Sequence, residues 1–458
     1  MTPLAVFRGL CYSSKRPRPI KTASQQENEK AMPTSSVMEY VSPEHLMRDA
    51  RVAAALAWLR ERNEETLAEQ IAFCEVPSPP FGEEARGEHL IARLKAEGLE
   101  DVRRDTEGNI IARIPAQEDG PLVVVVAHLD SVFPPDVHPK VQRQGHILRA
   151  PGIGDNARGL ACMLMLARTL RRFGLKARRP IILVGSVGEE GAGNLRGVRH
   201  LLAHEIAPES VGAFLVVDGL HAGYVTSSGQ GVIRERVICR GPGGHSYAHF
   251  GRPNPIHALG RALAEIAALS ERLAPWRDDP ALSALPTATC SVTRIGGGTS
   301  INALPEEAWF ELDLRAADAR KLAEVHAAYR AAVERAVAAE HGRSAFEHPG
   351  TAPEKLSLTF QVLGERPAGR MPDDAPLVLA GLAAARCITG SAHLGEPASC
   401  DVNIPLSLGV PGIVIGGGGN GGDTHALTEW YDATDSYQGP QLLLLLSLMA
   451  AGLANADS

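Results

Sequence analysis

Several features that would place a chain in a specialised class are missing from this sequence. Its 458 residues carry 46 basic and 53 acidic side chains, so no positive excess favours binding to nucleic acid or to an anionic membrane. No apolar run approaches the roughly 18 residues that a membrane-spanning helix needs. Seven cysteines are scattered without a CxxC pair, which is typical of reduced thiols. We therefore expect a cytoplasmic protein with no nucleic-acid or membrane partner.

The N-terminal residues differ in composition from the rest of the chain. Five basic side chains and no acidic one lie between Arg8 and Lys21. Arg8 also interrupts the first apolar stretch too early for a secretory signal. We expect residues 1–40 to form a disordered N-terminal extension. A transit-like segment and a misassigned start upstream of Met38 are the alternatives.

Four apolar segments share one design and indicate a parallel sheet. Each is a run of valine, isoleucine or leucine followed by polar residues, and together they are 122–130, 181–190, 213–219 and 412–425. Near-continuous runs of this kind are typical of strands buried on both faces, and helical sequence lies between the first two. The pattern predicts an α/β catalytic domain, with a largely parallel sheet flanked by helices, built from residues 41–230 and 371–458.

The character of the chain changes between these two parts. Residues 231–370 contain four segments with alternating faces and two long helical stretches, in the order strand-helix-strand-strand-helix-strand. That order predicts an inserted α+β domain with a four-stranded sheet.

Acidic and histidine side chains follow the predicted strands of the first domain. Each has an ordinary structural explanation when taken alone, such as a helix cap or a turn residue. The set consists of His128 and Asp130 in "AHLDS", Asp155 in "GIGDNARG", Glu189 and Glu190 in "GSVGEEG", Asp218 in "VVDG" and His425 in "GGDTHALTE". The carboxyl ends of parallel strands share one edge of a sheet, so these groups are expected to converge there. Imidazole with carboxylate is a ligand set suited to zinc, cobalt or manganese, and a pair of such ions is a known hydrolytic arrangement.

The chain resembles the co-catalytic zinc hydrolases that include aminoacylase, glutamate carboxypeptidase, acetylornithine deacetylase and the peptidase T-like tripeptide aminopeptidases. The likeness covers nearly everything from residue 60 on. It rests on the stretches "AHLDSV", "GIGDNARGLA", "GSVGEEGAGNLRGVRHL", "VVDG", "GPGGHSYAHFGRPNPIHAL", "SINALPEEAWFELDLR" and "GGGGNGGDTHALTEWYD".

This resemblance implies a role for each matching residue. His128 and Asp218 would hold one metal ion, Glu190 and His425 the other, and Asp155 would bridge the two. Asp130 would orient His128, and Glu189 would be the catalytic base. His245 in "GGHS" would stabilise the oxyanion of a neighbouring active site. Asn302 and Arg315 would contact substrate, although both also suit an ordinary turn and a strand end.

The implied activity is two-metal hydrolysis of an amide bond in a small peptide or an N-acyl amino acid. The nucleophile would be a metal-bridging water, and aminopeptidase- or dipeptidase-like substrates are slightly preferred. Zinc is the expected metal, with cobalt or manganese as alternatives, and the inserted domain would act as a lid and mediate homodimerisation.

Other interpretations remain open at this stage. A carbamoyl or ureido amidohydrolase would share the metal set, and a non-catalytic metal-stabilised scaffold would share the fold. Gly416, Gly418 and Gly421 satisfy a dinucleotide motif, but no strand-helix-strand unit follows them. Cys400 in "ASCDVN" is the nearest candidate for a thiol nucleophile, and a buried structural thiol is favoured instead. Ser399 and Asp401 beside it are expected at most to support the metal ligands.

Overall fold

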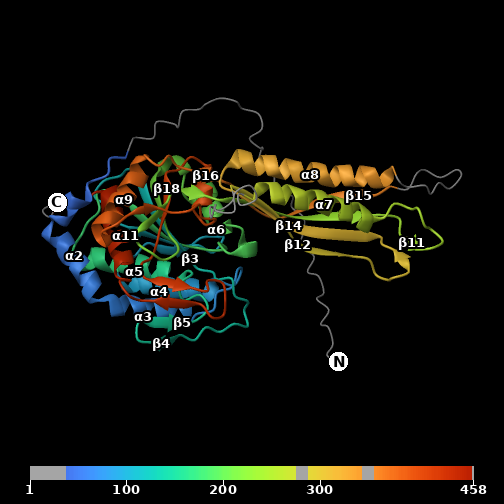
Figure 1. Ribbon diagram of the computed structural model, residues 1–458. Coiled ribbons are helices and arrows are strands. Elements are labelled where there is room, and N and C mark those ends of the chain that lie inside the picture. The colour runs from blue at the N-terminus through green and yellow to red at the C-terminus, as the bar shows by residue number, and fades with distance from the viewer. Residues whose placement is uncertain (1–37, 275–286, 343–354, 456–458) are drawn as a thin grey trace. The chain divides into compact units, whose positions relative to one another are not determined.

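The valine-rich run of residues 122–128 forms the centre of a mixed eight-stranded sheet, here called sheet A, in a computed structural model of the protein (Figure 1). The structure describes residues 38–274, 287–342 and 355–455. In spatial order the strands of sheet A are β1 (Val102–Arg104), β2 (Ile110–Ile114), β6 (Ile181–Ser186), β3 (Leu122–His128), β7 (Val211–Val217), β18 (Gly412–Ile415), β8 (Tyr224–Thr226) and β17 (His393–Leu394).

The four predicted strands are adjacent and parallel, as the apolar runs indicated. β3 pairs in parallel with β6 and with β7, and β18 pairs in parallel with β7. The sheet becomes mixed toward its edges, because β2 is antiparallel to β6 and β8 is antiparallel to β18. The predicted largely parallel α/β sheet is therefore confirmed, with antiparallel strands added outside the central four.

Helices pack against sheet A and complete one hydrophobic core. α5 and α11 contact both β3 and β7 and also contact each other. Every residue from Gly439 to Ala451 of α11 is buried, as expected for the run "QLLLLLSLMAA". The helices of this part are α1 (Pro43–Met47), α2 (Ala50–Glu61), α3 (Asn63–Cys74), α4 (Glu84–Ala96), α5 (Ala157–Arg172), α6 (Arg196–His200), α9 (Pro376–Thr389), α10 (Asn403–Ser407) and α11 (Gln438–Ala451).

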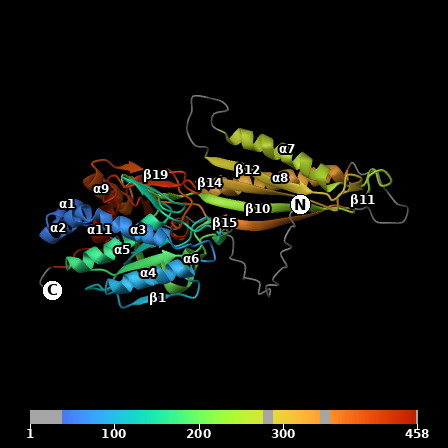
Figure 2. The ribbon, with the colours of Figure 1, turned by 90° about the horizontal axis from the view of Figure 1, so that it is seen from below.

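A second hydrophobic core is built on an antiparallel sheet, here called the lid sheet. Figures 1 and 2 show two long helices along one face of it. Its strands lie in the order β12 (Ala288–Gly297), β14 (Glu307–Ala316), β10 (Gly231–Arg240) and β15 (Ser357–Arg366), and its helices are α7 (Pro255–Leu273) and α8 (Ala319–His341). Alternate residues of β14 are buried, as the period-two pattern predicted. The inserted α+β fold with the order strand-helix-strand-strand-helix-strand is confirmed.

The proposed domain boundaries remain a prediction. The second core contains buried residues from Val237 to Leu356, which lie inside the predicted segment 231–370. Of the expected N-terminal extension, residues 1–37 lie outside the described residues, whereas Met38 is buried in the first core. Among the described residues, none of the helices combines the length and the apolar character that crossing a bilayer requires.

Three smaller strand groups lie outside these two sheets. One is a second four-stranded sheet, and the other two are two-stranded ribbons. The sheet contains β19 (Asn420–Gly422), β20 (Trp430–Asp432), β5 (Ile147–Arg149) and β4 (Gln142–Gln144), and the ribbons pair β11 (Gly244–His245) with β13 (Ala303–Leu304) and β16 (Gly369–Arg370) with β9 (Ser228–Gly229). The pairing of β20 with β5 joins the segment after His425 to the segment before Asp155.

Candidate metal centre

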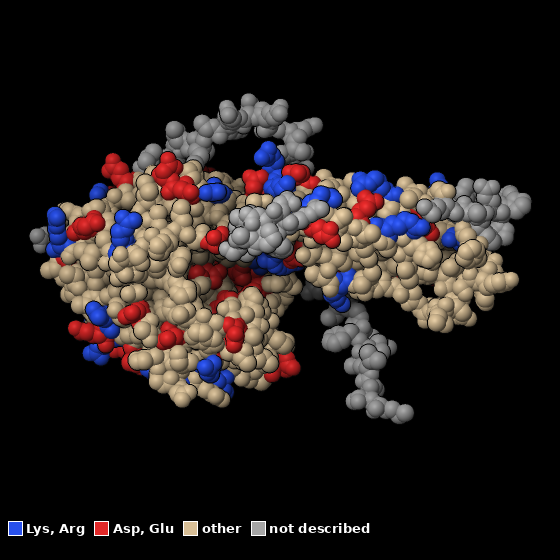
Figure 3. Space-filling model, in the orientation of Figure 1, with Lys and Arg blue, Asp and Glu red and all other residues tan. Residues whose placement is uncertain are grey.

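Side chains from several strand ends meet at one edge of sheet A. Figure 3 shows acidic side chains gathered in a hollow on one face of the protein. At this edge of sheet A lie three overlapping groups of potential ligand atoms, and the atoms of each group are within 4.8 Å of one another: His128 with Asp155 and Asp218, Asp155 with Glu190 and His425, and His128 with Glu189 and Glu190. Asp155 belongs to two of these groups, which is the arrangement expected of a residue that bridges two ions.

Asp155 lies between the two histidines. Its Oδ1 is 2.9 Å from Nε2 of His128, and its Oδ2 is 3.1 Å from Nε2 of His425. The same nitrogen of His425 lies 3.2 Å from Oε1 of Glu190. These carboxylates raise the pKa of His425 to about 10 through their hydrogen bonds, although partial burial opposes the shift. The five ligand candidates, which are distant in the sequence, therefore lie close together in the fold.

Burial and mutual repulsion perturb the carboxyl groups of the cluster. Burial raises the pKa of Asp218 to about 7, and the nearby negative charge of Asp155 adds to the shift. The pKa of Glu189 is raised well above its ordinary value, first by burial and then by Glu190 and Asp218, against the opposing charge of Arg366. Raised pKa values mark sites where negative charge is costly, and a cation placed among these groups would lower that cost.

The resemblance implies that Asp130 orients His128, and the structure shows this contact at the backbone of Asp130 rather than at its carboxylate. The ring Nδ1 of His128 lies 3.1 Å from the main-chain oxygen of Asp130 but 3.7 Å from its carboxylate, which is too long for a hydrogen bond. The carboxylate instead accepts the backbone N–H groups of Glu189 at 3.0 Å and Glu190 at 2.7 Å. Asp130 therefore holds His128 through its backbone and the glutamate pair through its side chain.

Arg366 is a site residue that the sequence did not reveal. It ends β15 of the lid sheet, is buried, and its Nη1 lies 2.9 Å from Oε1 of Glu189. It also donates to the main-chain oxygens of Glu189 and Ser399. The motif "GERPAG" gives no signal for this contact, because Arg366 and Glu189 are far apart in sequence and meet only through the fold.

Three predicted residues belong to the segment that forms the lid sheet and are not brought to the cluster: His245 on β11, Asn302 just before β13, and Arg315 on β14. His245 and Asn302 are both exposed, and β11 pairs with β13, so that His245 is opposite Ala303. Arg315 is half-buried on β14 and pairs with Asp313 at 2.8 Å. Within the described part of the chain, no hydrogen bond or ion pair joins any of the three to the metal-ligand candidates.

The distance from His245 to the cluster follows from strand register. The lid begins at Gly231 and ends at Arg366, and these residues lie at the same end of β10 and β15. β10 then runs ten residues to Arg240, which spans about 30 Å at roughly 3.3 Å per residue. β11 follows Arg240 closely, so His245 lies at the end of the lid sheet remote from Arg366.

The segment around Cys400 supports the cluster and does not supply a nucleophile. Burial raises the pKa of the Cys400 thiol well above its usual value, so the thiolate is disfavoured. Asp401 is buried and accepts a hydrogen bond of 2.5 Å from Ser186 at the end of β6. Ser399 meets the site through Arg366, as described above.

The donor set fits a pair of divalent cations. Imidazole nitrogens and carboxylate oxygens are the ligands of zinc, cobalt and manganese in hydrolytic sites. The two carboxylate oxygens of Asp155 lie beside different histidine nitrogens, so this side chain could serve as a ligand to both cations. The buried carboxylates with raised pKa values also need positive charge nearby, which two cations would supply.

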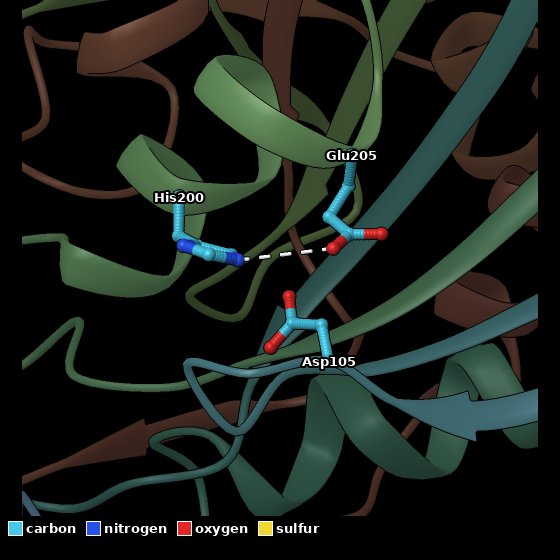
Figure 4. A group of neighbouring side chains, drawn as sticks. All are labelled: Asp105, His200 and Glu205. Carbon is cyan, nitrogen blue, oxygen red and sulfur yellow. Dashed lines mark ion pairs between the residues drawn. The ribbon is translucent and has the colours of Figure 1, made fainter.

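A fourth group of potential ligands, shown in Figure 4, is less suited to a metal ion. It contains Asp105, His200 and Glu205. Oδ1 of Asp105 already accepts the backbone N–H groups of residues 107–109, and Glu205 pairs with Arg103 at 2.5 Å. A cation would compete with these donors and face the guanidinium, so the group has a structural explanation.

Comparison with known proteins identifies the family. A model described as peptidase family M20/M25/M40 matches residues 124–448. The chain belongs to this family. The resemblance deduced from the sequence is thereby confirmed, and the chain is a member of a family of metal-dependent hydrolases.

Two curated relatives and two solved structures illustrate the range of M20 proteins that this chain is similar to. It is 26% identical over 216 residues to an N-acetylcysteine deacetylase of Bacillus subtilis, covering 45% of this chain and 53% of that protein. It is 26% identical over 254 residues to a succinyl-diaminopimelate desuccinylase of Corynebacterium glutamicum, covering 55% and 66%. The matches thus span about half to two thirds of these relatives.

The solved structures extend the likeness of fold to almost the whole of each neighbour. An aminopeptidase PepT from Bacillus cereus superposes with a TM-score of 0.67 at 19% identity, covering 85% of this chain and 99% of that chain. A human carnosine dipeptidase superposes with a TM-score of 0.62 at 13% identity, covering 88% and 99%. These similarities establish the M20 fold, with an α/β part and a separate antiparallel sheet.

Proposed function

We propose that this protein hydrolyses an amide bond in a small peptide or an N-acyl amino acid, using two divalent cations. His128 and Asp218 would hold one cation, Glu190 and His425 the other, and Asp155 would bridge them. The observation that carries this proposal is the position of Asp155, whose two carboxylate oxygens each lie within 3.1 Å of a different histidine. Two such cations, when bound, lower the pKa of a water molecule and polarise a carbonyl group.

Glu189 is proposed as the general base. It is 5% exposed, and burial raises its pKa, which makes its carboxylate a stronger proton acceptor than an exposed glutamate. Its backbone is fixed by Asp130 and its carboxylate by Arg366, so the side chain is held in one place. Glu189 takes the proton of the attacking water and then gives it to the leaving amine.

The substrate class is inferred from the chemistry that similar proteins share. The names of the two relatives denote removal of an acetyl or succinyl group, and those of the structural neighbours denote cleavage of peptides. All of these reactions break an amide bond. We propose a peptide or N-acyl amino acid as substrate on this ground, with zinc as the metal and cobalt or manganese as alternatives.

We also propose that two copies of the chain form a dimer through the lid. β12 is an edge strand of the lid sheet, and its Ile295 is 62% exposed. His245 lies about 30 Å along the lid from the end that carries Arg366, so it would serve the active site of a second copy rather than its own. The six cysteines among the described residues are free, which supports the cytoplasm as the expected location.

A substrate panel with a matched pair of variants tests the proposal. The purified protein is loaded with zinc, cobalt or manganese and assayed against dipeptides, tripeptides, N-acetyl amino acids and N-carbamoyl amino acids. Glu189→Gln should retain two metal ions per chain and lose about 10²- to 10⁴-fold in kcat, the range associated with a general base. Glu205→Gln, which alters the group in Figure 4, should leave metal content and activity unchanged.

Each contrary result has a defined meaning. Metal bound without hydrolysis of any substrate would favour the non-catalytic scaffold. Turnover of N-carbamoyl substrates alone would move the protein to the ureido class. A wild-type rate in Glu189→Gln would remove Glu189 from the proposed mechanism.

A further inference from the structure

Glu429 lies beside the proposed metal centre but belongs to none of the groups of potential ligand atoms. It follows His425 by four residues in "HALTEW", and it is 2% exposed. Among the described residues, no lysine or arginine forms an ion pair with it. Burial of a carboxylate without a cationic partner is costly unless other donors compensate.

The donors that compensate belong to the backbone next to Asp155. Oε2 of Glu429 accepts the N–H of Gly152 at 2.7 Å. Oε1 accepts the N–H of Gly154 at 2.9 Å and that of Asp155 at 3.2 Å. One buried side chain thus accepts three backbone N–H groups of a single loop and fixes the backbone from which the Asp155 side chain projects.

The main chain strengthens this connection between the two segments. The backbone oxygen of Glu429 accepts the N–H of Ala150 at 3.1 Å. The next residue, Trp430, pairs with Arg149 where β20 meets β5. Gly154 is also closely fitted, because a Cβ at that position would lie 3.1 Å from Oε1 of Glu429. The segment 149–155 is therefore docked against the segment that carries His425.

We propose that Glu429 is a positioning residue that sets the relative placement of Asp155 and His425, and hence the geometry of the second cation site. The inference rests on the proposed metal centre. His425 is itself exposed on a loop, in a left-handed conformation with φ of 68°, and its contact with Asp155 spans 3.1 Å. Glu429 acts through the Asp155 loop and touches no reacting atom.

The substitution Glu429→Gln tests this role with little change in shape. A glutamine has one acceptor oxygen, and its amide nitrogen would face at least one of the N–H donors in the loop. We expect the affinity for one of the two Zn²⁺ ions to fall about 10- to 100-fold, as when a partner of a metal ligand is removed. The measurement is competition between the metal-free protein and a chelator, and the visible spectrum with Co²⁺ should change because the ligand geometry changes.

Glu340→Gln provides the matched control. Glu340 is also a buried carboxylate that accepts a backbone N–H, that of Asn254 at 3.1 Å, but it pairs with Arg261 at 2.8 Å and belongs to α8 of the lid. This variant should lower the unfolding temperature while leaving both Zn²⁺ affinities and the Co²⁺ spectrum as in the wild type. Gly154→Ala is the second variant, since it crowds Oε1 while keeping the carboxylate, and a smaller loss of affinity is expected.

The outcomes separate this inference from the proposed function. Wild-type Zn²⁺ affinities and Co²⁺ spectrum in both Glu429→Gln and Gly154→Ala would overturn it, as would a wild-type protein that binds no metal. A wild-type protein that binds two ions but hydrolyses no substrate would end the proposed function. The role of Glu429 would still be decided by metal affinity in that case.

Discussion

Glu189 and Glu235 show how burial and a cationic neighbour compete at a single carboxyl group. Each is paired with an arginine, Glu189 with Arg366 at 2.9 Å and Glu235 with Arg330 at 2.6 Å. At Glu189, burial and the surrounding carboxylates prevail, and the pKa is raised. At Glu235, burial also favours the protonated form, but hydrogen bonds from His326 and Arg330 outweigh it, and the pKa is lowered. The neighbouring charges decide the direction.

The lowered pKa of Glu235 predicts a pH-dependent contribution to stability. A group whose pKa is lower in the folded state stabilises the fold above its unfolded pKa, about 4.3 for glutamate, and loses that contribution as the pH falls through the folded value. Glu235→Gln should therefore reduce the free energy of unfolding at pH 7 by about 1–3 kcal/mol. The measurement is urea unfolding at a series of pH values. The difference in unfolding free energy between Glu235→Gln and the wild type should shrink as the pH falls below about 5.

Glu324 on α8, which packs against the lid sheet, is the control for the effect of removing a negative charge. Glu324 is exposed, and its one ion pair within the described part of the chain is with Lys321, at 3.2 Å. Glu324→Gln should change the unfolding free energy by less than about 0.5 kcal/mol at either pH. If the difference in unfolding free energy between Glu235→Gln and the wild type did not change with pH, the lowered pKa of Glu235 would be contradicted.

At the scale of elements, the start of α5 is anchored to the end of β7. Asn156 caps the helix, accepting the N–H of Gly159 at 2.9 Å, and donates to the main-chain oxygen of Val217 at 2.9 Å. Gly159 is required at this junction, because a Cβ there would lie 2.5 Å from the Val217 oxygen. The contact fixes Asp155, just before the helix, relative to Asp218, just after the strand.

Asn156→Ala should therefore cost more than an ordinary cap substitution. It removes a helix cap and leaves a buried backbone acceptor without its donor, for an expected loss of about 2–4 kcal/mol of unfolding free energy. Asp318→Ala at the start of α8 is the comparison, since this cap is exposed and its side chain accepts, among the residues that the structure describes, only the N–H of Lys321. It should cost about 1 kcal/mol. Equal losses in thermal unfolding monitored by circular dichroism would show that the link to β7 contributes nothing.

At the scale of the whole molecule, one chain does not bring all the predicted site residues together. The metal-ligand candidates and Glu189 gather at sheet A, whereas His245 lies on a ribbon at the remote end of the lid sheet. This separation is the reason for proposing that a second copy supplies His245. A closed dimer would exchange the histidine in both directions, because the two copies are related by symmetry.

Subunit mixing tests that exchange. Glu189→Gln and His245→Ala should each lose most activity alone, because one lacks the base and the other lacks the oxyanion donor. Random pairing makes about half of the dimers mixed, and each mixed dimer has one intact site, so about a quarter of the wild-type activity should return. The measurement is the rate after subunits have been allowed to exchange. Recovery of no activity, or full activity in His245→Ala, would contradict the proposal.

Much of the fold was predictable because its signals are local. Near-continuous valine runs mark strands buried on both faces, and β3, β6, β7 and β18 follow them. The short strands β1 and β8, which pair antiparallel with β2 and β18, were not identified, because each has only three residues and no distinctive pattern. Short strands depend on the neighbours they pair with rather than on their own sequence.

The order and spacing of the motifs determined the family, the inserted domain and the set of side chains that meet at sheet A, because buried strands and the polar residues that follow them are encoded locally. Only the tertiary structure revealed the contacts of Arg366 with Glu189 and of Glu429 with the Asp155 loop. It also showed that the carboxylate of Asp130 holds the glutamate pair and that His245 is remote from the cluster. These contacts join residues far apart in the chain, and a hydrogen bond between such residues depends on the packing of whole elements rather than on any local pattern.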